Sequence, residues 1–114
     1  METQSLRQKK VARLLERTLN EYFRVNAALF SGLMITVTEV LAAQDLKMAR
    51  VYISIFGISV DKEKALVLVS SHGKAIRGYV GHQLGKQLQF IPELFFKLDD
   101  SLDKIAEIDR LLAK

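Results

Sequence analysis

Two short stretches of this chain, residues 33–41 and 50–56, alternate between residues that suit the two faces of a strand. Their β-branched content and period of two predict β-strands. The segment between them contains Gln44 and Asp45 and is polar enough for a chain reversal. We therefore expect an antiparallel hairpin with one apolar face, which packs against a helix.

Helical spacing precedes the hairpin. From about Leu6 to Ala28, apolar and basic residues recur every three or four positions on two different faces, which predicts one amphipathic helix. The apolar positions are Val11, Leu14, Leu15, Thr18, Leu19, Tyr22, Phe23 and Leu29, and the basic ones are Lys10, Arg13, Arg17 and Arg24. Gly32 ends this pattern.

The second half of the chain returns to helical spacing. Asp61 is a suitable N-cap for a helix, although the apolar run at residues 65–69 is also compatible with a buried strand. Gly73 interrupts this helix, the pattern resumes at Lys74, and Pro92 stops it. Residues 94–98 then alternate as a last strand, and the segment from about residue 99 to 114 predicts a C-terminal helix.

The predicted order of elements is helix, strand, strand, helix, break, helix, strand and helix. This order indicates an α+β fold with a three-stranded sheet and helices on one face. The helix-break-helix followed by a strand resembles the core of KH domains, here preceded by a helix. Such folds bind single-stranded or irregular RNA along the helix-turn-helix element.

Length and composition agree with one globular domain. The chain has 114 residues, of which 49% are hydrophobic and 26% charged. It has no cysteine, so neither disulfides nor a cysteine zinc site is available. No apolar run approaches the length of a membrane span, and residues 1–20 do not have the form of a signal peptide. We expect a cytoplasmic protein that does not contact membranes.

The formal net charge of +4 is concentrated in two segments. Residues 1–24 hold six basic and three acidic side chains, and residues 64–92 hold four basic side chains and no acidic one. Two separate basic segments on a small chain are typical of a protein that binds a phosphate backbone. A solvated basic surface without a partner is the alternative.

Three stretches of the sequence resemble the ribosome-binding factor A family of bacterial assembly factors. Residues 35–54, with Asp45-Leu46 and Val51-Tyr52, are similar to the hairpin of the family. Residues 76–81, which begin Ile76-Arg77, are similar to the start of its third helix. Residues 91–102 are similar to its closing strand, and the resemblance covers nearly the whole chain.

The resemblance implies one type II KH-like domain over residues 1–114, with no cofactor and no enzymatic activity. It also implies binding to the rRNA of immature small ribosomal subunits, help in late rRNA maturation near the 5′-terminal helix, and release by a GTPase. The protein is expected to be a monomer. The Asp-Pro-Arg of the family is absent before the first strand. Its helix kink falls at residues 71–73 by the letters, but alignment on Ile76-Arg77 puts Lys74 at the glycine position.

The candidate RNA-binding residues are basic side chains and the glycines beside them. They are Lys10, Arg13, Arg17, Lys47, Lys74, Arg77, Gly78, Gly81, His82 and Lys86. Phosphate contact is the function expected of the lysines and arginines. Gly78, Gly81 and Gly85 are spaced to share one helical face, which favours close approach of another backbone, either RNA or a neighbouring helix. We expect Gly81→Ala to weaken RNA binding without loss of stability.

Other functions receive less support from the sequence. Residues 78–81 match the G-x-x-G string of KH loops, but they lie inside a helical pattern, so a loop is not expected. His72 and His82 fall on different helical faces, which predicts minor RNA contacts or solvent exposure rather than a metal site. No catalytic motif is present. A domain that binds another protein through its apolar tail helix and Phe95/Phe96 is the alternative.

Overall fold

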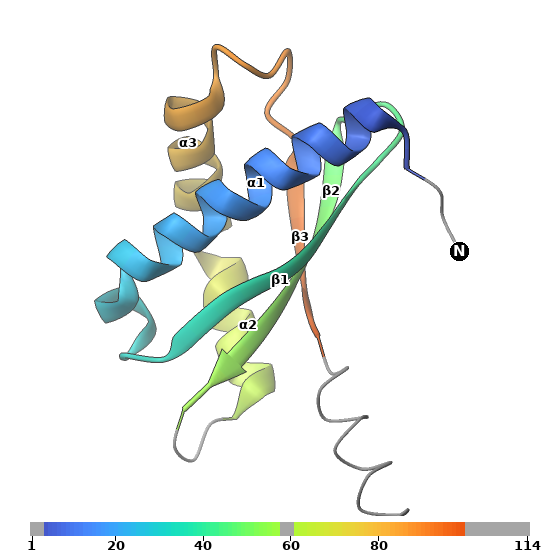
Figure 1. The fold of residues 1–114 in the computed structure, drawn as a ribbon. Coiled ribbons are helices and arrows are strands. Elements are labelled where there is room, and N and C mark those ends of the chain that lie inside the picture. Colours follow the sequence, from blue (N-terminus) through green and yellow to red (C-terminus); the bar gives the residue numbers. More distant parts are fainter. Residues whose placement is uncertain (1–3, 58–60, 100–114) are drawn as a thin grey trace, which may run out of the picture.

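The computed structural model describes residues 4–57 and 61–99 (Figure 1). These residues form an α+β domain in which three helices cover one face of a three-stranded sheet, as predicted. In chain order, the elements are α1 (Leu6–Val25), the short 3-10 helix η1 (Ala27–Phe30), β1 (Met34–Ala42), β2 (Met48–Phe56), α2 (Lys62–Ser71), α3 (Gly73–Leu84) and β3 (Glu93–Leu98).

The sheet has the order β1-β2-β3. β1 and β2 form the predicted antiparallel hairpin, with Ile35 opposite Ile55 and Ala42 opposite Ala49. The register shifts between Val37 and Glu39, where one strand carries an extra residue. β3 lies parallel to β2, so α2 and α3 together form the crossover that such a pairing requires.

The hydrophobic core lies between the helices and one face of the sheet. Alternate residues of β2 are buried, and α1 packs mainly against β1 while α2 packs against β3. The largest fully buried side chains include Leu15, Leu19, Phe30, Ile53 and Ile76. Within the described residues no charged or polar side chain is buried, so ionisable groups are left for the surface.

The first helix begins with a capping box. The Ser5 hydroxyl accepts a hydrogen bond from the Gln8 N–H (3.1 Å), and the Gln8 side chain accepts one from the Ser5 N–H (2.7 Å). The sequence predicts an end at about Ala28, but the helix ends at Val25, because the chain tightens into the 3-10 helix η1 there. The left-handed Ser31 and Gly32 (φ 55° and 72°) then direct it into β1.

This early helix end corrects one assignment of core residues. Helical periodicity places Leu29 on the apolar stripe, but in η1 its side chain is half exposed. Phe30, which the periodicity does not single out, is only 1% exposed. Its ring packs edge-on against Phe23 and Tyr22, at centroid distances of 5.4 and 6.4 Å. The 3-10 turn therefore replaces one core side chain with another.

The helix-break-helix prediction is confirmed. Asp61 caps α2 by accepting a hydrogen bond from the Lys64 N–H (3.2 Å), which excludes the strand alternative for residues 65–69. The break falls at His72, between Ser71 and Gly73, as the letters of the family kink suggest. The sequence predicts a minor RNA contact or solvent exposure for His72, but its side chain is half-buried, with the ring 5.0 Å from the Phe30 ring.

The end of α3 differs from the prediction. The helix ends at Leu84 and does not continue to Pro92. Gly85 is its C-cap, and both Gln87 and Leu88 donate backbone hydrogen bonds to the Leu84 carbonyl (2.8 and 3.0 Å) in the following turn. The chain leaves the helix here because it must reach the start of β3, beside the hairpin turn.

The predicted C-terminal helix lies outside the described residues, apart from Asp99. The Asp99 N–H donates to the Ile53 carbonyl (2.8 Å), and its carboxylate accepts from the Thr38 hydroxyl. None of the helices within residues 4–57 and 61–99 is long and apolar enough to cross a membrane.

Candidate nucleic-acid interface

Three of the candidate residues lie on one exposed surface of α3. Lys74, Arg77 and Gly78 stand three and four positions apart, so they share a face, and they line a shallow depression with residues 89–91 as its other wall. A guanidinium N–H of Arg77 donates to the Ile91 carbonyl (2.7 Å), which joins the two walls. The remaining donors of the guanidinium are available for a ligand.

The fourth candidate, Lys47, comes from the hairpin turn. The Lys47 N–H donates to the Asp45 carboxylate (3.0 Å), and the Leu46 N–H donates to the Ala43 carbonyl (2.9 Å). This tight turn puts Leu46 in a left-handed conformation with φ 61°. The Lys47 carbonyl accepts from the Glu93 N–H (2.9 Å), so the turn is tied to the start of β3.

Phe90 connects the two sets of cations. Its ring lines the depression beside Lys74 and Arg77, and the Lys47 Nζ lies over the same ring, 5.8 Å from its centroid. Phe90 is 50% exposed although it is a large apolar side chain. It also lines a second depression that includes Arg7, at the start of α1. An exposed aromatic ring beside four basic side chains is typical of surfaces that bind nucleic acids.

Neither Phe90 nor Arg7 is among the sequence candidates. The available signal for Phe90 is an aromatic residue in the acid-free segment, directly before Ile91-Pro92. The prediction of a helix up to Pro92 hides this signal, because it makes Phe90 one more helical residue. Two acids lie near this surface, since Asp45 lines the second depression and Glu93 follows Pro92. The basic side chains still outnumber them.

The α1 candidates form a separate and more mixed surface. Lys10, Arg13 and Arg17 are exposed, but Glu16 and Glu21 stand among them, and both line a shallow depression with Arg13 and Arg17. Opposite charges on one face weaken its attraction for phosphate. We therefore rank this surface below the one that contains Phe90.

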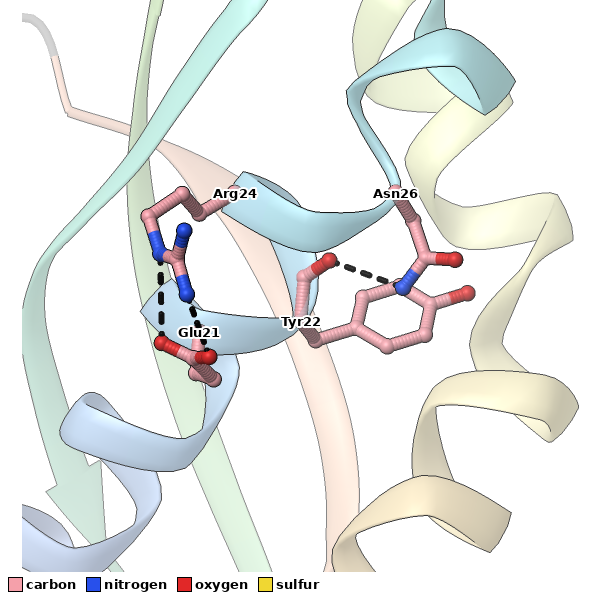
Figure 2. Close-up of polar contacts among 4 residues, drawn as sticks. All are labelled: Glu21, Tyr22, Arg24 and Asn26. Atoms are coloured by element: carbon pink, nitrogen blue, oxygen red, sulfur yellow. Dashed lines mark hydrogen bonds and ion pairs between the residues drawn. The ribbon is translucent and has the colours of Figure 1, made fainter.

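Arg24, from the predicted basic stripe, is already paired. Figure 2 shows its guanidinium against the Glu21 carboxylate, with the Nη2 and Nε atoms 2.5 and 3.2 Å from the two carboxylate oxygens. The hydrogen bond to Glu21, followed by its negative charge, raises the pKa of Arg24. Asn26 closes the helix end beside it by donating to the Tyr22 carbonyl (2.9 Å). Arg24 is thus a weaker phosphate ligand than an unpaired arginine.

His82 and Lys86 lie at the C-terminal end of α3. Both side chains are exposed, His82 in the last turn of the helix and Lys86 directly after the Gly85 cap. They extend the basic character of this end of the molecule. No group of three or more possible metal ligands occurs among residues 4–57 and 61–99.

The three glycines differ in their surroundings, and Gly85, the C-cap of α3, still follows Gly81 by one turn, since its N–H donates to the Gly81 carbonyl (2.9 Å). A Cβ at Gly85 would lie 2.5 Å from the Gly81 carbonyl oxygen, so the backbone itself requires glycine there. A Cβ at Gly81 would make an ordinary contact of 3.6 Å with Ile91. At Gly78, a Cβ would meet nothing within 4 Å, so of the three only this glycine opens onto free space.

Residues 78–81 lie inside α3, with Val80 buried and Tyr79 half-buried, so the G-x-x-G string is not a loop, as predicted.

The alternative, in which Phe95 and Phe96 bind another protein, can rely on only one of these two side chains. Phe96 is buried in the core, where its ring packs edge-on against Phe23 (6.4 Å), whereas Phe95 is exposed on the sheet face opposite α1, α2 and α3.

The order of helices and strands, with a parallel third strand and a helix break before it, defines a KH-like α+β domain. The crystal structure of ribosome-binding factor A from Thermus thermophilus has this fold, with a TM-score of 0.66 and 22% sequence identity over 80% of this chain and 94% of that one. The solution structure of a Thermotoga maritima protein described as a putative ribosome binding factor A gives a TM-score of 0.64 at 16% identity, over 85% and 91% of the two chains.

Sequence comparison defines the family. The profile of ribosome-binding factor A matches residues 7–112. Ribosome-binding factor A from Cytophaga hutchinsonii is 36% identical, over 97% of this chain and 84% of that protein. The Dictyoglomus thermophilum protein is 34% identical over 95% and 87%. The chain therefore belongs to the ribosome-binding factor A family, which confirms the resemblance found in the sequence.

Proposed function

We propose that this protein binds the small ribosomal subunit through its RNA, and that Lys47, Lys74 and Arg77 contact the phosphates. Membership of the family supports the ribosomal partner. A model of the Thermus thermophilus relative fitted into a map of a 30S complex has the same fold, with a TM-score of 0.61 and 22% identity over 78% of this chain and 91% of that one. The observation that carries the assignment of the surface is the convergence of these three cations around Phe90.

The proposal extends to the stage of assembly. The protein acts on immature subunits, assists late maturation of the rRNA, and leaves when a GTPase releases it. It works in the cytoplasm as a monomer without a cofactor, and as a binding factor rather than an enzyme. The resemblance to the family supports these points, and the exposed basic surface supplies the contact that they require.

The test is binding of a charge-reversed variant to purified precursor subunits over a series of salt concentrations. Lys74→Glu with Arg77→Glu turns two attractions into repulsions, so binding should weaken by about tenfold or more at low salt. The log–log salt slope should become shallower by about 1.4–1.8, because two phosphate contacts are lost.

Lys64→Glu with Lys97→Glu is the matched control. Both of its lysines are exposed and lie outside the depressions around Phe90, and the change in net charge is the same. This variant should bind nearly as well as the wild type. If both variants bind equally, the phosphate contacts have been assigned to the wrong surface.

A protein-binding function remains the second candidate, carried by Phe95. Its side chain is 41% exposed on the sheet face opposite the helices, where Met48 and Phe56 are exposed too. An apolar contact releases no counterions. A salt slope near zero for association with the subunits, together with loss of binding in Phe95→Ser, would support this candidate over the first.

A further inference from the structure

We propose that the depression between α3 and Phe90 holds an unpaired nucleobase, stacked on the Phe90 ring. This inference rests on the proposed function and specifies the ligand of the same surface: a single-stranded nucleotide rather than a duplex. Phosphates on either side of the stacked base would lie within reach of Lys74, Arg77 and Lys47.

The first argument is the exposure of Phe90. A phenylalanine side chain gains roughly 1.5–3 kcal/mol from full burial, so a half-exposed ring on a small domain forgoes part of this stabilisation. The chain beside it is held in place, since Arg77 bonds the Ile91 carbonyl and the Glu93 N–H bonds the Lys47 carbonyl. The ring is therefore presented by a fixed segment.

The second argument is the open space on the α3 wall of the depression. Gly78 belongs to the α3 wall of the depression, and a Cβ there would meet nothing within 4 Å. Glycine in a helix costs about 1 kcal/mol relative to alanine, so it is not selected for helix stability. The open space at Gly78 lets a flat group approach the α3 backbone in the same depression as the ring.

The third argument is the combination of chemistries. A nucleobase stacks on an aromatic ring with any sequence, and a nearby lysine or arginine binds the phosphate. The Phe90 ring provides the first element, and Lys74 and Arg77 in the same depression, with the Lys47 ammonium over the ring, provide the second. A duplex cannot use such a ring, because its bases are already stacked.

A tryptophan reporter tests the stacking directly. The chain contains no tryptophan, so Phe90→Trp introduces a single indole at the proposed site. We expect a short single-stranded RNA to quench its fluorescence in a saturable way. Phe56→Trp is the matched control, since Phe56 is also exposed but lies at the opposite end of β2, roughly 26 Å from Met48. Its fluorescence should change little.

Two changes that remove the stack without changing any charge complete the test. Phe90→Leu should weaken binding of the RNA by roughly 5- to 100-fold and leave the salt slope unchanged. An abasic oligonucleotide of the same length should bind the wild type more weakly than the intact one and should not quench Phe90→Trp.

The outcomes separate this inference from the proposed function. If RNA binds Phe90→Trp without quenching, and the abasic strand binds equally well, the stacked base is wrong while phosphate binding by this surface stands. If a duplex of the same length quenches as strongly as the single strand, the inference also fails. If an acidic peptide quenches and RNA does not, the site takes a protein segment. Loss of the proposed function itself would appear as salt-independent binding to subunits.

Discussion

The Asn20 side chain pairs with the backbone of Val37 through two hydrogen bonds. The Val37 N–H donates to the Asn20 Oδ1 (2.7 Å), and the Asn20 Nδ2 donates to the Val37 carbonyl (3.2 Å). β1 is an outer strand of the sheet, and the amide of Asn20 satisfies both backbone groups as a neighbouring strand would. α1 is thereby fixed to β1 at the position where the register of the hairpin shifts.

Asn20→Ala removes both bonds and leaves the Val37 groups without their partner. We expect a loss of about 1–3 kcal/mol in the free energy of unfolding, measured by urea titration. Asn20→Asp keeps the acceptor but sets a carboxylate oxygen against the Val37 carbonyl, so it should destabilise as well. Gln83→Ala, at an exposed position of α3, is the control and should stay within about 0.5 kcal/mol. An unchanged Asn20→Ala midpoint would show that the pairing adds nothing to stability.

Two glycines should respond to alanine in opposite directions. At Gly85 the new methyl group would lie 2.5 Å from a backbone oxygen, so the turn must shift, and we expect a loss of about 1–3 kcal/mol. At Gly78 the methyl group has free space, and the unfolded chain loses freedom, so stability should rise by about 0.4–1 kcal/mol. Thermal unfolding of both variants measures this difference. Equal melting temperatures would contradict it.

The aromatic cluster under η1 depends on Phe30. Its ring is almost fully buried and packs against Tyr22, Phe23 and His72. Phe30→Ala should cost about 3–5 kcal/mol of stability, through lost burial and the cavity left behind. Leu29→Ala, one position earlier, removes a half-exposed side chain and should cost far less. Denaturant unfolding of the two variants measures both losses. If Leu29→Ala proved the more costly, our assignment of the core would be wrong.

Tyr22 provides a prediction about pH. Burial raises the pKa of Tyr22 above its usual value of 10, so the folded protein keeps the phenol neutral at a pH where the unfolded chain ionises it. The folded state then binds more protons, and stability falls as the pH rises beyond about 10. Tyr22→Phe lacks this loss. Its melting temperature relative to the wild type should therefore be higher at about pH 10.5–11 than at about pH 8, and an equal difference at both values would contradict the cause.

The elements that could be predicted from the sequence are those whose residues carry their own local signal. The β-branched alternation of residues 50–56 marked β2, the capping carboxylate of Asp61 marked α2, and Gly73 marked the break before α3. The arrangement on one sheet face follows, since the buried residues of each element form one stripe. The direction of β3 carried no such signal, because a short strand has the same pattern whether parallel or antiparallel.

The errors occurred where tertiary contacts overrode helical periodicity. The apolar stripes of α1 and α3 extend to Leu29 and Leu88, yet both helices end earlier. After α1 the chain turns to bury Phe30. After Leu84 it leads to the hairpin turn, where β3 begins. Periodicity reports which residues suit a helix, but the position of the partner strand decides where the helix ends.

The sequence predicts the basic residues of the candidate surface, but not which side chains the fold brings together there. Lys74 and Arg77 stood out because residues 64–92 contain no acid. That Lys47 and Phe90 join them depends on the backbone hydrogen bond between Lys47 and Glu93, which no local pattern encodes. The α1 arginines, in contrast, share their face with Glu16 and Glu21, and this mixture can already be read from the helical spacing in the sequence.

The parallel pairing of β2 with β3 also has a consequence for the order of folding. The hairpin and α1 involve neighbouring parts of the chain, whereas β3 can pair only after α2 and α3 have been made and folded back. Because synthesis proceeds from the N-terminus, the hairpin turn is available long before its partner strand. Lys47 and Phe90 can meet only after the segment that leads into β3 has been made and placed beside the hairpin turn, so a chain that stops short of this segment lacks the surface that we assign to RNA. The ability to bind through this surface would then arise together with completion of the sheet.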